Sequence, residues 1–234
     1  MRVLFLNLWD GELSDALRLF LDEQRDIEVF CFQEFRDADD VLPEFLRAYQ
    51  KFTVSKQIAA RVNYSQAVYV HPSWRVDNIV ELMRPDPEIG LALGLRVSLL
   101  EKSYEIINVQ GTPRALQDGV WQVNDDKKDF PARLRQSQTL REFAQKQIAP
   151  IVMGGDFNVS PDSESIEIFR RAGYQDLIRD YKIATTRNHF SWERYVTKHF
   201  YSDYVFLSPE LTVKNFIVPN VEVSDHLPLI LEIA

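Results

Sequence analysis

An aspartate and an asparagine stand two residues apart just after an apolar run in this 234-residue chain. The run covers residues 151–153, two glycines follow it, and Asp156 and Asn158 come next. Side chains two residues apart on an extended chain point to the same side. The carboxylate can act as a base or bind a metal ion, whereas the amide only donates and accepts hydrogen bonds. The pair therefore predicts a polar site at a strand end, although an Asx turn explains the same pair taken alone.

Three further polar clusters stand beside apolar runs elsewhere in the chain. Asn7 follows the run 3–6, Glu34 follows the run 27–32, and Asp225-His226 stand directly before the run 227–233. Each has a simpler reading by itself: Asn7 as a residue that ends a strand, Glu34 as a solvated strand end, and His226 as a core histidine with a satisfied ring. Together, four such clusters are typical of an active site on the rim of an α/β sheet.

Hydrophobic periodicity predicts the elements that must position these groups. Strands are expected over 3–8, 27–32, 52–58, 67–70, 76–83, 91–100, 104–109, 151–153, 204–207, 211–218 and 227–233. Helices are expected over 12–25, 41–49, 131–147 and 163–172, the last capped by Asp162. Residues 111–129 are expected to form a long polar loop. Strand-rich halves with interleaved helices predict an α/β fold of two stacked sheets with helices outside.

Composition limits the classes of protein that fit. The chain has a net charge of −8, with 27 Lys and Arg against 35 Asp and Glu, which argues against a broad basic face that coats nucleic acid. The single cysteine, Cys31, forms no internal disulfide and fits a reducing compartment. The apolar run near the N-terminus is too short for a signal peptide, because a polar residue interrupts it early, and no apolar run approaches membrane-spanning length. We therefore expect a cytoplasmic protein without stable membrane association.

Five motifs, taken in order, resemble those of the endonuclease/exonuclease/phosphatase superfamily, whose members include DNase I-like nucleases, apurinic-site endonucleases, sphingomyelinases and inositol-polyphosphate phosphatases. Asn7 and Glu34 match two of the motifs in the N-terminal part of the chain. The other three are GDFN at 155–158, SDYVF at 202–206 and SDHLP at 224–228. The resemblance runs from end to end of the chain.

This resemblance implies a fold, a reaction and a cofactor. The fold is a four-layer α/β sandwich, in which two packed mixed β-sheets are flanked by helices, and residues 1–234 form a single domain. The reaction is hydrolysis of phosphate esters with Mg²⁺ or Mn²⁺. The resemblance also makes Glu34 a metal ligand and Asp203 the carboxylate that orients His226.

The chemistry of phosphate-ester hydrolysis supports these roles. The reaction needs a cation on the phosphoryl oxygen, an activated water and help for the leaving oxygen. Glu34 is a hard oxygen ligand, and Asp225 and Asn7 are expected to complete or support its metal shell. Asp156 and Asn158 are expected to take a proton from water and to orient the water or the phosphate. His226 donates to the phosphate as an imidazolium if a carboxylate raises its pKa.

Gln110 departs from the family pattern. The superfamily usually has histidine after this strand, or tyrosine in the apurinic-site branch, and glutamine carries neither a proton nor a positive charge to the site. Gln110 still donates a hydrogen bond to a phosphate oxygen, so we keep it among the catalytic candidates. Either the enzyme is slower or prefers a less charged substrate, or another cation substitutes, with Arg187, His189 and His199 as candidates.

Three functions compete. The leading one is a metal-dependent phosphodiesterase or nuclease, acting as a monomer by in-line attack of water. The second is a phosphomonoesterase on inositol or lipid headgroups. The third is a weakly active or inactive family member that serves as a binding module, which the glutamine at 110 motivates. Nucleic acid is the first expectation for the substrate because it is the commonest substrate in the superfamily, which is an argument by analogy.

Overall fold

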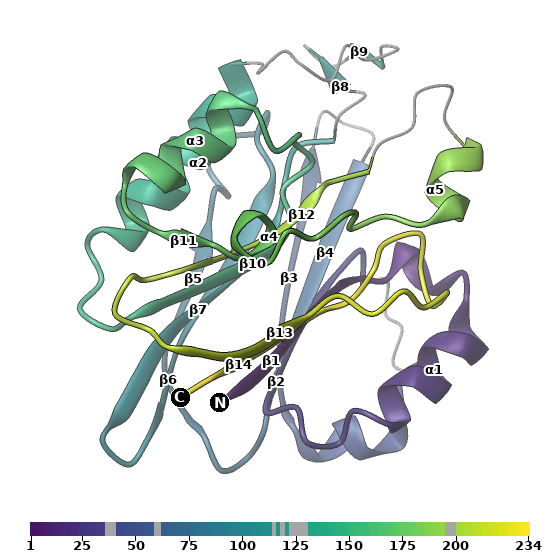
Figure 1. Ribbon diagram of the computed structural model, residues 1–234, viewed down its shortest axis with the longest axis vertical. Coiled ribbons are helices and arrows are strands. Elements are labelled where there is room, and N and C mark those ends of the chain that lie inside the picture. The colour runs from purple at the N-terminus through teal and green to yellow at the C-terminus, as the bar shows by residue number, and fades with distance from the viewer. Residues whose placement is uncertain (36–40, 59–61, 114–115, 118–119, 122–130, 195–199) are drawn as a thin grey trace.

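Two six-stranded β-sheets form the centre of the protein in this computed structural model, which describes residues 1–35, 41–58, 62–113, 116–117, 120–121, 131–194 and 200–234 (Figure 1). The first sheet has the strand order β13-β14-β1-β2-β4-β3. Its strands are β1 (Arg2–Asn7), β2 (Val29–Gln33), β3 (Gln50–Ile58), β4 (Val62–Val70), β13 (Val213–Ile217) and β14 (Leu229–Ile233).

The second sheet has the strand order β11-β12-β10-β7-β6-β5. Its strands are β5 (Arg75–Leu82), β6 (Leu91–Leu99), β7 (Lys102–Gln110), β10 (Ile151–Asp156), β11 (Gln175–Asp176) and β12 (Asp203–Leu207). Both sheets are mixed, because β1 pairs with β2 and β7 pairs with β10 in parallel while the neighbouring pairs are antiparallel. A small hairpin of β8 (Leu116–Gln117) and β9 (Val120–Trp121) stands apart from them.

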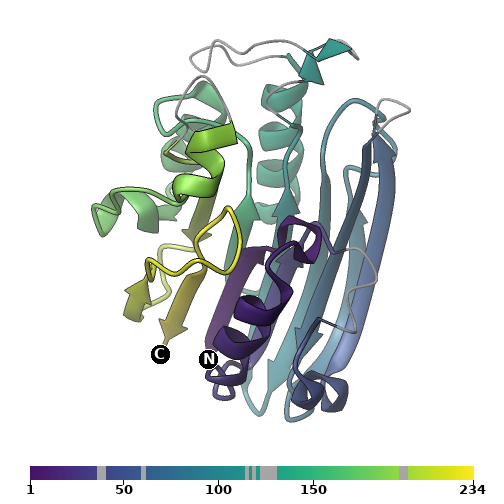
Figure 2. The ribbon, with the colours of Figure 1, turned by 90° about the vertical axis from the view of Figure 1, so that its right-hand side faces the viewer.

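The chain also forms helices outside the two sheets. They are α1 (Ser14–Asp22), α2 (Pro131–Ala144), α3 (Glu164–Arg171), α4 (Leu177–Asp180) and α5 (His189–Arg194), with short 3-10 helices η1 (Trp9–Gly11) and η3 (Glu44–Ala48). Figure 1 shows α2 and α3 on one side of the sheets and α1 on the other, and Figure 2 shows α1 in front of the first sheet. This is the predicted four-layer α/β sandwich.

Alternate residues of β1 face two different hydrophobic cores. Val3 and Phe5 belong to the core that lies between the sheets, whereas Leu4 and Leu6 pack with Leu17 of α1. Alternate residues of a strand point to opposite faces, so β1 contributes to both cores. Asn7 has the same parity as Phe5 and therefore faces the second sheet at the end of β1.

Several local predictions need correction. Residues 41–49 contain only the 3-10 helix η3, which begins after Pro43. Helix α3 is capped by Ser163, whose side chain accepts from the backbone N–H of Ile166, and not by Asp162. The expected loop over 111–129 includes the hairpin of β8 and β9. Within the described residues, no helix is both long enough and apolar enough to span a bilayer.

Candidate active site

The strand directions bring the predicted residues to one edge of both sheets. Asn7 is paired with Gln33 at the ends of the parallel strands β1 and β2, and Gln110 is paired with Asp156 at the ends of β7 and β10. Asp203 begins the antiparallel strand β12 and lies opposite Asp156. The chain termini lie at the other end of the sheets (Figure 1). The carboxyl ends of parallel strands commonly carry the sites of α/β proteins.

Close packing of the two sheets joins their polar edges. A Cβ atom on Gly154 would lie 2.9 Å from the ring of Phe5, so only glycine lets the sheets approach this closely. Two residues further along β10, Asp156 faces the first sheet. There Asn7 Nδ2 donates to Asp156 Oδ2 at 3.2 Å. A hydrogen bond between side chains 149 residues apart thus links the two sheets inside the site.

Glu34 lies at the centre of the polar contacts from both sheets. Its Oε1 accepts from Asn7 Nδ2 at 3.0 Å and from Gln110 Nε2 at 3.4 Å. Its backbone is left-handed, with a φ of 50°, and that of Asn158 is too, with a φ of 56°. Non-glycine residues hold such angles at a cost of about 1–3 kcal/mol each, and strain of this kind concentrates at functional sites.

Asn158 is tied to Asp156 by two hydrogen bonds. Its backbone N–H donates to Asp156 Oδ1 at 2.9 Å, and its Nδ2 donates to Asp156 Oδ2 at 3.0 Å. The first contact is the Asx-turn bond that the sequence also allowed. Turn and site coexist, because the same carboxylate accepts from Asn7 across the sheets.

His226 is held by carboxylates on two sides. Its Nδ1 lies 2.9 Å from Asp203 Oδ1, and its Nε2 lies 3.9 Å from Asp156 Oδ2 and 3.7 Å from Asp225 Oδ1. The hydroxyl of Ser202 donates to Asp203 Oδ2 at 2.8 Å. An aspartate on Nδ1 orients the ring and leaves Nε2 to face the rest of the site.

Arg187 enters the same cluster from the segment that precedes α5. An isolated β-bridge pairs it with His226. Its Nη1 lies 2.7 Å from His226 Nε2, and its Nη2 lies 2.7 Å from Asp225 Oδ2. The contact with Nε2 is a hydrogen bond only while this nitrogen carries no proton.

Burial and charge shift the pKa values of the cluster. Burial raises the pKa of Glu34 to about 6, although the charge of His226 and the hydrogen bond from Asn7 oppose it. Burial also raises the pKa of Asp156. Burial and Arg187 lower the pKa of His226, but the carboxylates of Asp203, Asp225 and Asp156 outweigh them and hold it at about 9. Protonation of His226 therefore requires Arg187 to leave Nε2.

Asp203 differs in the direction of its pKa shift from Glu34 and Asp156. Burial acts to raise its pKa, but the charge and hydrogen bond of His226 outweigh burial and hold the pKa of Asp203 below its usual value. The lowered pKa keeps Asp203 ionised beside the ring. The pKa values of Glu34 and Asp156 are raised instead, because their burial disfavours the charged carboxylate.

The donor set fits a hard divalent cation. The ligand atoms of Asp156, Asp203 and His226 lie within 4.8 Å of one another, and Glu34 and Asp225 add carboxylates to the same edge. The side-chain oxygen of Gln110 is fully buried and has no hydrogen-bond partner among the described residues. Oxygen ligands of this kind suit Mg²⁺ or Mn²⁺, whose charge would offset the raised pKa values.

All eight residues expected at the site lie at this edge: Asn7, Glu34, Gln110, Asp156, Asn158, Asp203, Asp225 and His226. Of the three candidate cations, the structure places Arg187 against His226. The side chain of His189 is 41% exposed and pairs with Glu222, and His199 lies outside the described residues.

Sequence reasoning missed two supporting hydroxyls. Ser202 bonds to Asp203, and the hydroxyl of Thr186 accepts from the backbone N–H groups of Ser202 and Asp203. Ser202 was detectable as the first residue of the SDYVF motif, directly before Asp203. No motif or periodicity indicated a role for Thr186, because its contact depends on the path of an irregular segment.

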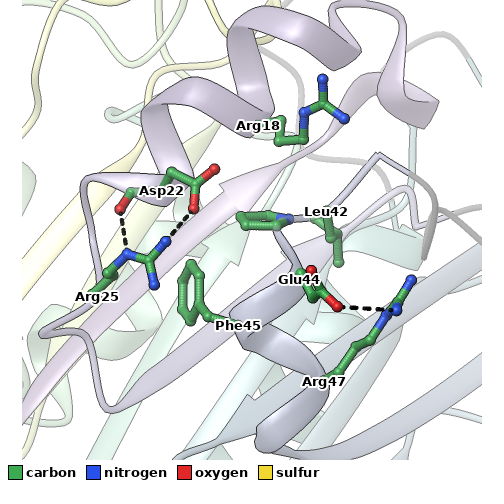
Figure 3. Close-up of a pocket in the computed structure, with 8 residues that line it drawn as sticks. Arg18, Asp22, Arg25, Leu42, Glu44, Phe45 and Arg47 are labelled. Carbon is green, nitrogen blue, oxygen red and sulfur yellow. Dashed lines mark hydrogen bonds and ion pairs between the residues drawn. The ribbon is translucent and has the colours of Figure 1, made fainter.

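A second concave region lies far from this edge, between α1 and η3. We call it the arginine pocket; it has a volume of about 670 Å³ (Figure 3). It is lined by Arg18, Asp22, Arg25, Leu42, Pro43, Glu44, Phe45 and Arg47. Each arginine pairs with a nearby acid, as in Arg25–Asp22 at 2.7 Å and Arg47–Glu44 at 3.6 Å. These exposed pairs do not resemble the buried cluster.

Two packed mixed sheets with an acidic, amide and imidazole cluster at one shared edge define a DNase I-like enzyme. The chain belongs to the endonuclease/exonuclease/phosphatase family, whose model matches residues 4–226. The predictions of the family, of its fold and of a phosphoesterase enzyme are confirmed. A comparison with curated proteins gave no significant match.

Solved structures share the fold over the whole chain. The mannosyl-6-phosphatase Bt3783 of Bacteroides thetaiotaomicron is 16% identical with a TM-score of 0.72, and the match covers 100% of this chain and 99% of the other. The human Nocturnin catalytic domain is 19% identical, with a TM-score of 0.74 and coverage of 100% and 93%. The D. rerio TDP2, solved with a single-strand DNA product, is 14% identical, with a TM-score of 0.73 and coverage of 100% and 98%.

Proposed function

We propose that the protein is a Mg²⁺-dependent phosphodiesterase that hydrolyses nucleic acid by in-line attack of water. The observation that carries the proposal is the link between the two sheets, in which Asn7 contacts both Glu34 and Asp156. Asp156 belongs in turn to a group with Asp203 and His226, whose ligand atoms lie within 4.8 Å of one another. Mn²⁺ is the alternative ion, since it takes the same oxygen ligands.

Glu34 and Asp225 are the residues that would hold the ion, and Asn7 would support them, because its NH2 group faces Glu34 while its oxygen accepts from the backbone N–H of Trp9. When bound, the ion would stabilise negative charge on the phosphoryl oxygens. Asn7 also fixes the position of Glu34 through its 3.0 Å hydrogen bond. Because Glu34 Oε1 accepts from Gln110 as well, the carboxylate has one defined orientation in the cluster.

The remaining residues act on water and on the phosphate. Asp156 takes a proton from the attacking water, a contribution of about 10²–10⁴-fold for a positioned base. Asn158 holds Asp156 and orients the water or phosphate. Asp203 fixes the ring of His226, whose Nε2 faces the substrate side. Gln110 donates a neutral hydrogen bond to a phosphate oxygen.

Nucleic acid is the proposed substrate because one solved relative by fold, TDP2, holds a single-strand DNA product. A phosphomonoester is the second candidate, because the relative Bt3783 is a mannosyl-6-phosphatase with the same fold. A binding module without turnover is less consistent with the structure, since the seven matched residues other than Gln110 all lie at the site. The monomeric state, the single domain over 1–234 and the cytoplasmic location stay predictions.

The test is a substrate panel with Mg²⁺ or Mn²⁺: bis-(p-nitrophenyl) phosphate, single- and double-stranded DNA, RNA, abasic DNA, sugar phosphates, inositol phosphates and sphingomyelin. We expect turnover of the diesters that chelation abolishes. Turnover of monoesters alone would refute the phosphodiesterase and favour the second candidate, a phosphomonoesterase. Rates no higher than those of Asp156→Ala on every substrate would refute the enzyme proposal for this site.

A further inference from the structure

Positive charge is scarce at the cluster. Four carboxylates meet there, from Glu34, Asp156, Asp203 and Asp225. Gln110 carries no charge at any pH. Among the described residues that contact these carboxylates inside the cluster, the groups able to carry a positive charge are His226 and Arg187.

The guanidinium of Arg187 is held in place from several sides. Its Nε donates to Ser191 Oγ at 3.0 Å, its Nη1 donates to Ser202 Oγ at 3.2 Å, and its Nη2 pairs with Asp225 at 2.7 Å. Only 10% of the Arg187 side chain is exposed. A charged donor that is fixed before the substrate arrives costs no reorganisation during the reaction.

One donor of Arg187 is directed at a replaceable partner. Nη1 lies 2.7 Å from His226 Nε2, the nitrogen that lies 3.9 Å from Asp156 and that faces the substrate side of the ring. A negatively charged phosphoryl oxygen is a better acceptor for the guanidinium than Nε2 in either state of the ring, because a neutral Nε2 accepts more weakly and a protonated Nε2 cannot accept at all. The same N–H therefore has a better acceptor once a phosphate enters.

We propose that Arg187 is a phosphate-binding residue, whose Nη1, which faces His226 Nε2 in the protein without substrate, donates to a non-bridging phosphoryl oxygen when substrate binds. It supplies the charge that Gln110 lacks, from the opposite side of Asp156. The proposal rests on the proposed phosphoesterase function for its kinetic consequences, but the anion contact itself does not require turnover. No covalent step involves Arg187.

The direct test is a crystal structure of the wild-type protein with Mg²⁺ and saturating inorganic phosphate. We expect a phosphate oxygen within hydrogen-bond distance of Arg187 Nη1. An anion in the cluster with Nη1 still on His226 Nε2 would overturn the proposal, as would the absence of any anion from the cluster. This readout does not depend on the stability of a variant.

The kinetic test compares Arg187→Gln and Arg187→Lys with Arg25→Gln, a change to the arginine pocket. Arg187→Gln should lower kcat/KM on the best substrate of the panel by about 10²-fold, the usual scale for one preorganised donor at a developing charge. Arg187→Lys should lose less, because it keeps the charge but not the planar fork. Arg25→Gln should leave kcat/KM unchanged.

A second substitution separates charge supply from a purely structural role. If Arg187 supplies charge, adding Gln110→His to Arg187→Gln should raise kcat/KM at least tenfold, because histidine can carry the positive charge that the variant lacks. A structural role predicts no rescue. Wild-type rates in a folded Arg187→Gln would refute the inference and leave the proposed function standing. Phosphate bound to Arg187 in a protein without turnover would support the inference and refute the proposed function.

Discussion

The active-site cluster and the arginine pocket contain the same kinds of groups in opposite settings. Both pair arginines with carboxylates at short distance, such as Arg187–Asp225 and Arg25–Asp22, each at 2.7 Å. The side chains of the first pair are 10% and 6% exposed, whereas those of the second are 65% and 41% exposed. Burial, rather than distance, separates the two regions.

The difference matters because water screens exposed charges. Exposed ion pairs contribute about 0–1 kcal/mol and hold no fixed geometry. Buried charges keep their strength and shift one another's pKa values, as at Glu34 and His226. A concave surface with arginines is therefore a weaker indication of a site than a small buried cluster with strained backbone.

The largest expected effect comes from removing the proposed base. Asp156→Ala should lower kcat/KM by about 10³-fold in the presence of Mg²⁺, because the attacking water loses its proton acceptor. Asp22→Ala, in the arginine pocket, is the matched control and should keep the wild-type rate. Steady-state kinetics of both variants, with circular dichroism to confirm folding, measures the difference. Equal rates for the two variants would show that the active-site cluster matters no more for activity than the arginine pocket.

A smaller effect is expected from Asp203→Asn. Asparagine keeps the shape beside His226 Nδ1 but removes the charge that favours the imidazolium. The rate kcat should fall about 10–100-fold with little change in KM, since the ring is less well oriented and charged. Asp180→Asn, an exposed position that pairs with Arg179, is the control. A rise in KM alone would indicate a binding role instead.

Glu34→Gln should separate stability from activity. The pKa of Glu34 is about 6 in the folded protein against an ordinary 4.5, so its contribution to stability is present below pH 4.5 and is lost as pH rises through about 6. Without metal, the variant should be more stable than wild type at pH 8 by up to about 2 kcal/mol, and equal to it near pH 4.5. Denaturation in chelator at both pH values measures this.

The same variant should lose activity and its response to Mg²⁺. Wild-type protein should be stabilised by Mg²⁺ through binding to the folded state, and Glu34→Gln should not. A Glu34→Gln protein that is less stable than wild type at pH 8 would contradict the pKa argument. One that still responds fully to Mg²⁺ would contradict the ligand assignment.

The smallest effect is expected in the arginine pocket. Arg25→Ala removes an exposed pair and should change the free energy of unfolding by less than about 1 kcal/mol. Its kcat/KM should stay within twofold of wild type on every substrate. Thermal denaturation and the substrate panel measure both quantities. A tenfold loss of activity would show that the pocket belongs to the site after all.

Most of the site could be predicted from the sequence because its residues stand at strand ends. The parity of Asn7 and Asp156 on their strands, and the positions of Glu34 and His226 beside apolar runs, are local properties of the chain. Strand pairing then fixes their convergence, since neighbouring strands align their ends. The alternation of strands and helices was likewise enough for two sheets with helices outside.

The contact of Arg187 could not be predicted. It stands in an irregular segment, and its position depends on contacts with distant residues, such as the β-bridge to His226 and the ion pair with Asp225. Sequence alone could not choose between Arg187, His189 and His199, because no periodicity governs such a segment. The separation of the sheets was also hidden, because it depends on Gly154 meeting the ring of Phe5 across the core.

In the proposed mechanism, residues from both sheets act together on one phosphate. A double-mutant cycle tests this most directly, with Glu34→Gln at the end of β2 in the first sheet, Asp156→Ala at the end of β10 in the second, and the two combined, measured as kcat/KM with Mg²⁺. Residues that act as a unit give grossly non-additive effects, so the double variant should be about as slow as the slower single variant. Losses that simply multiply would show two independent groups and contradict a shared site.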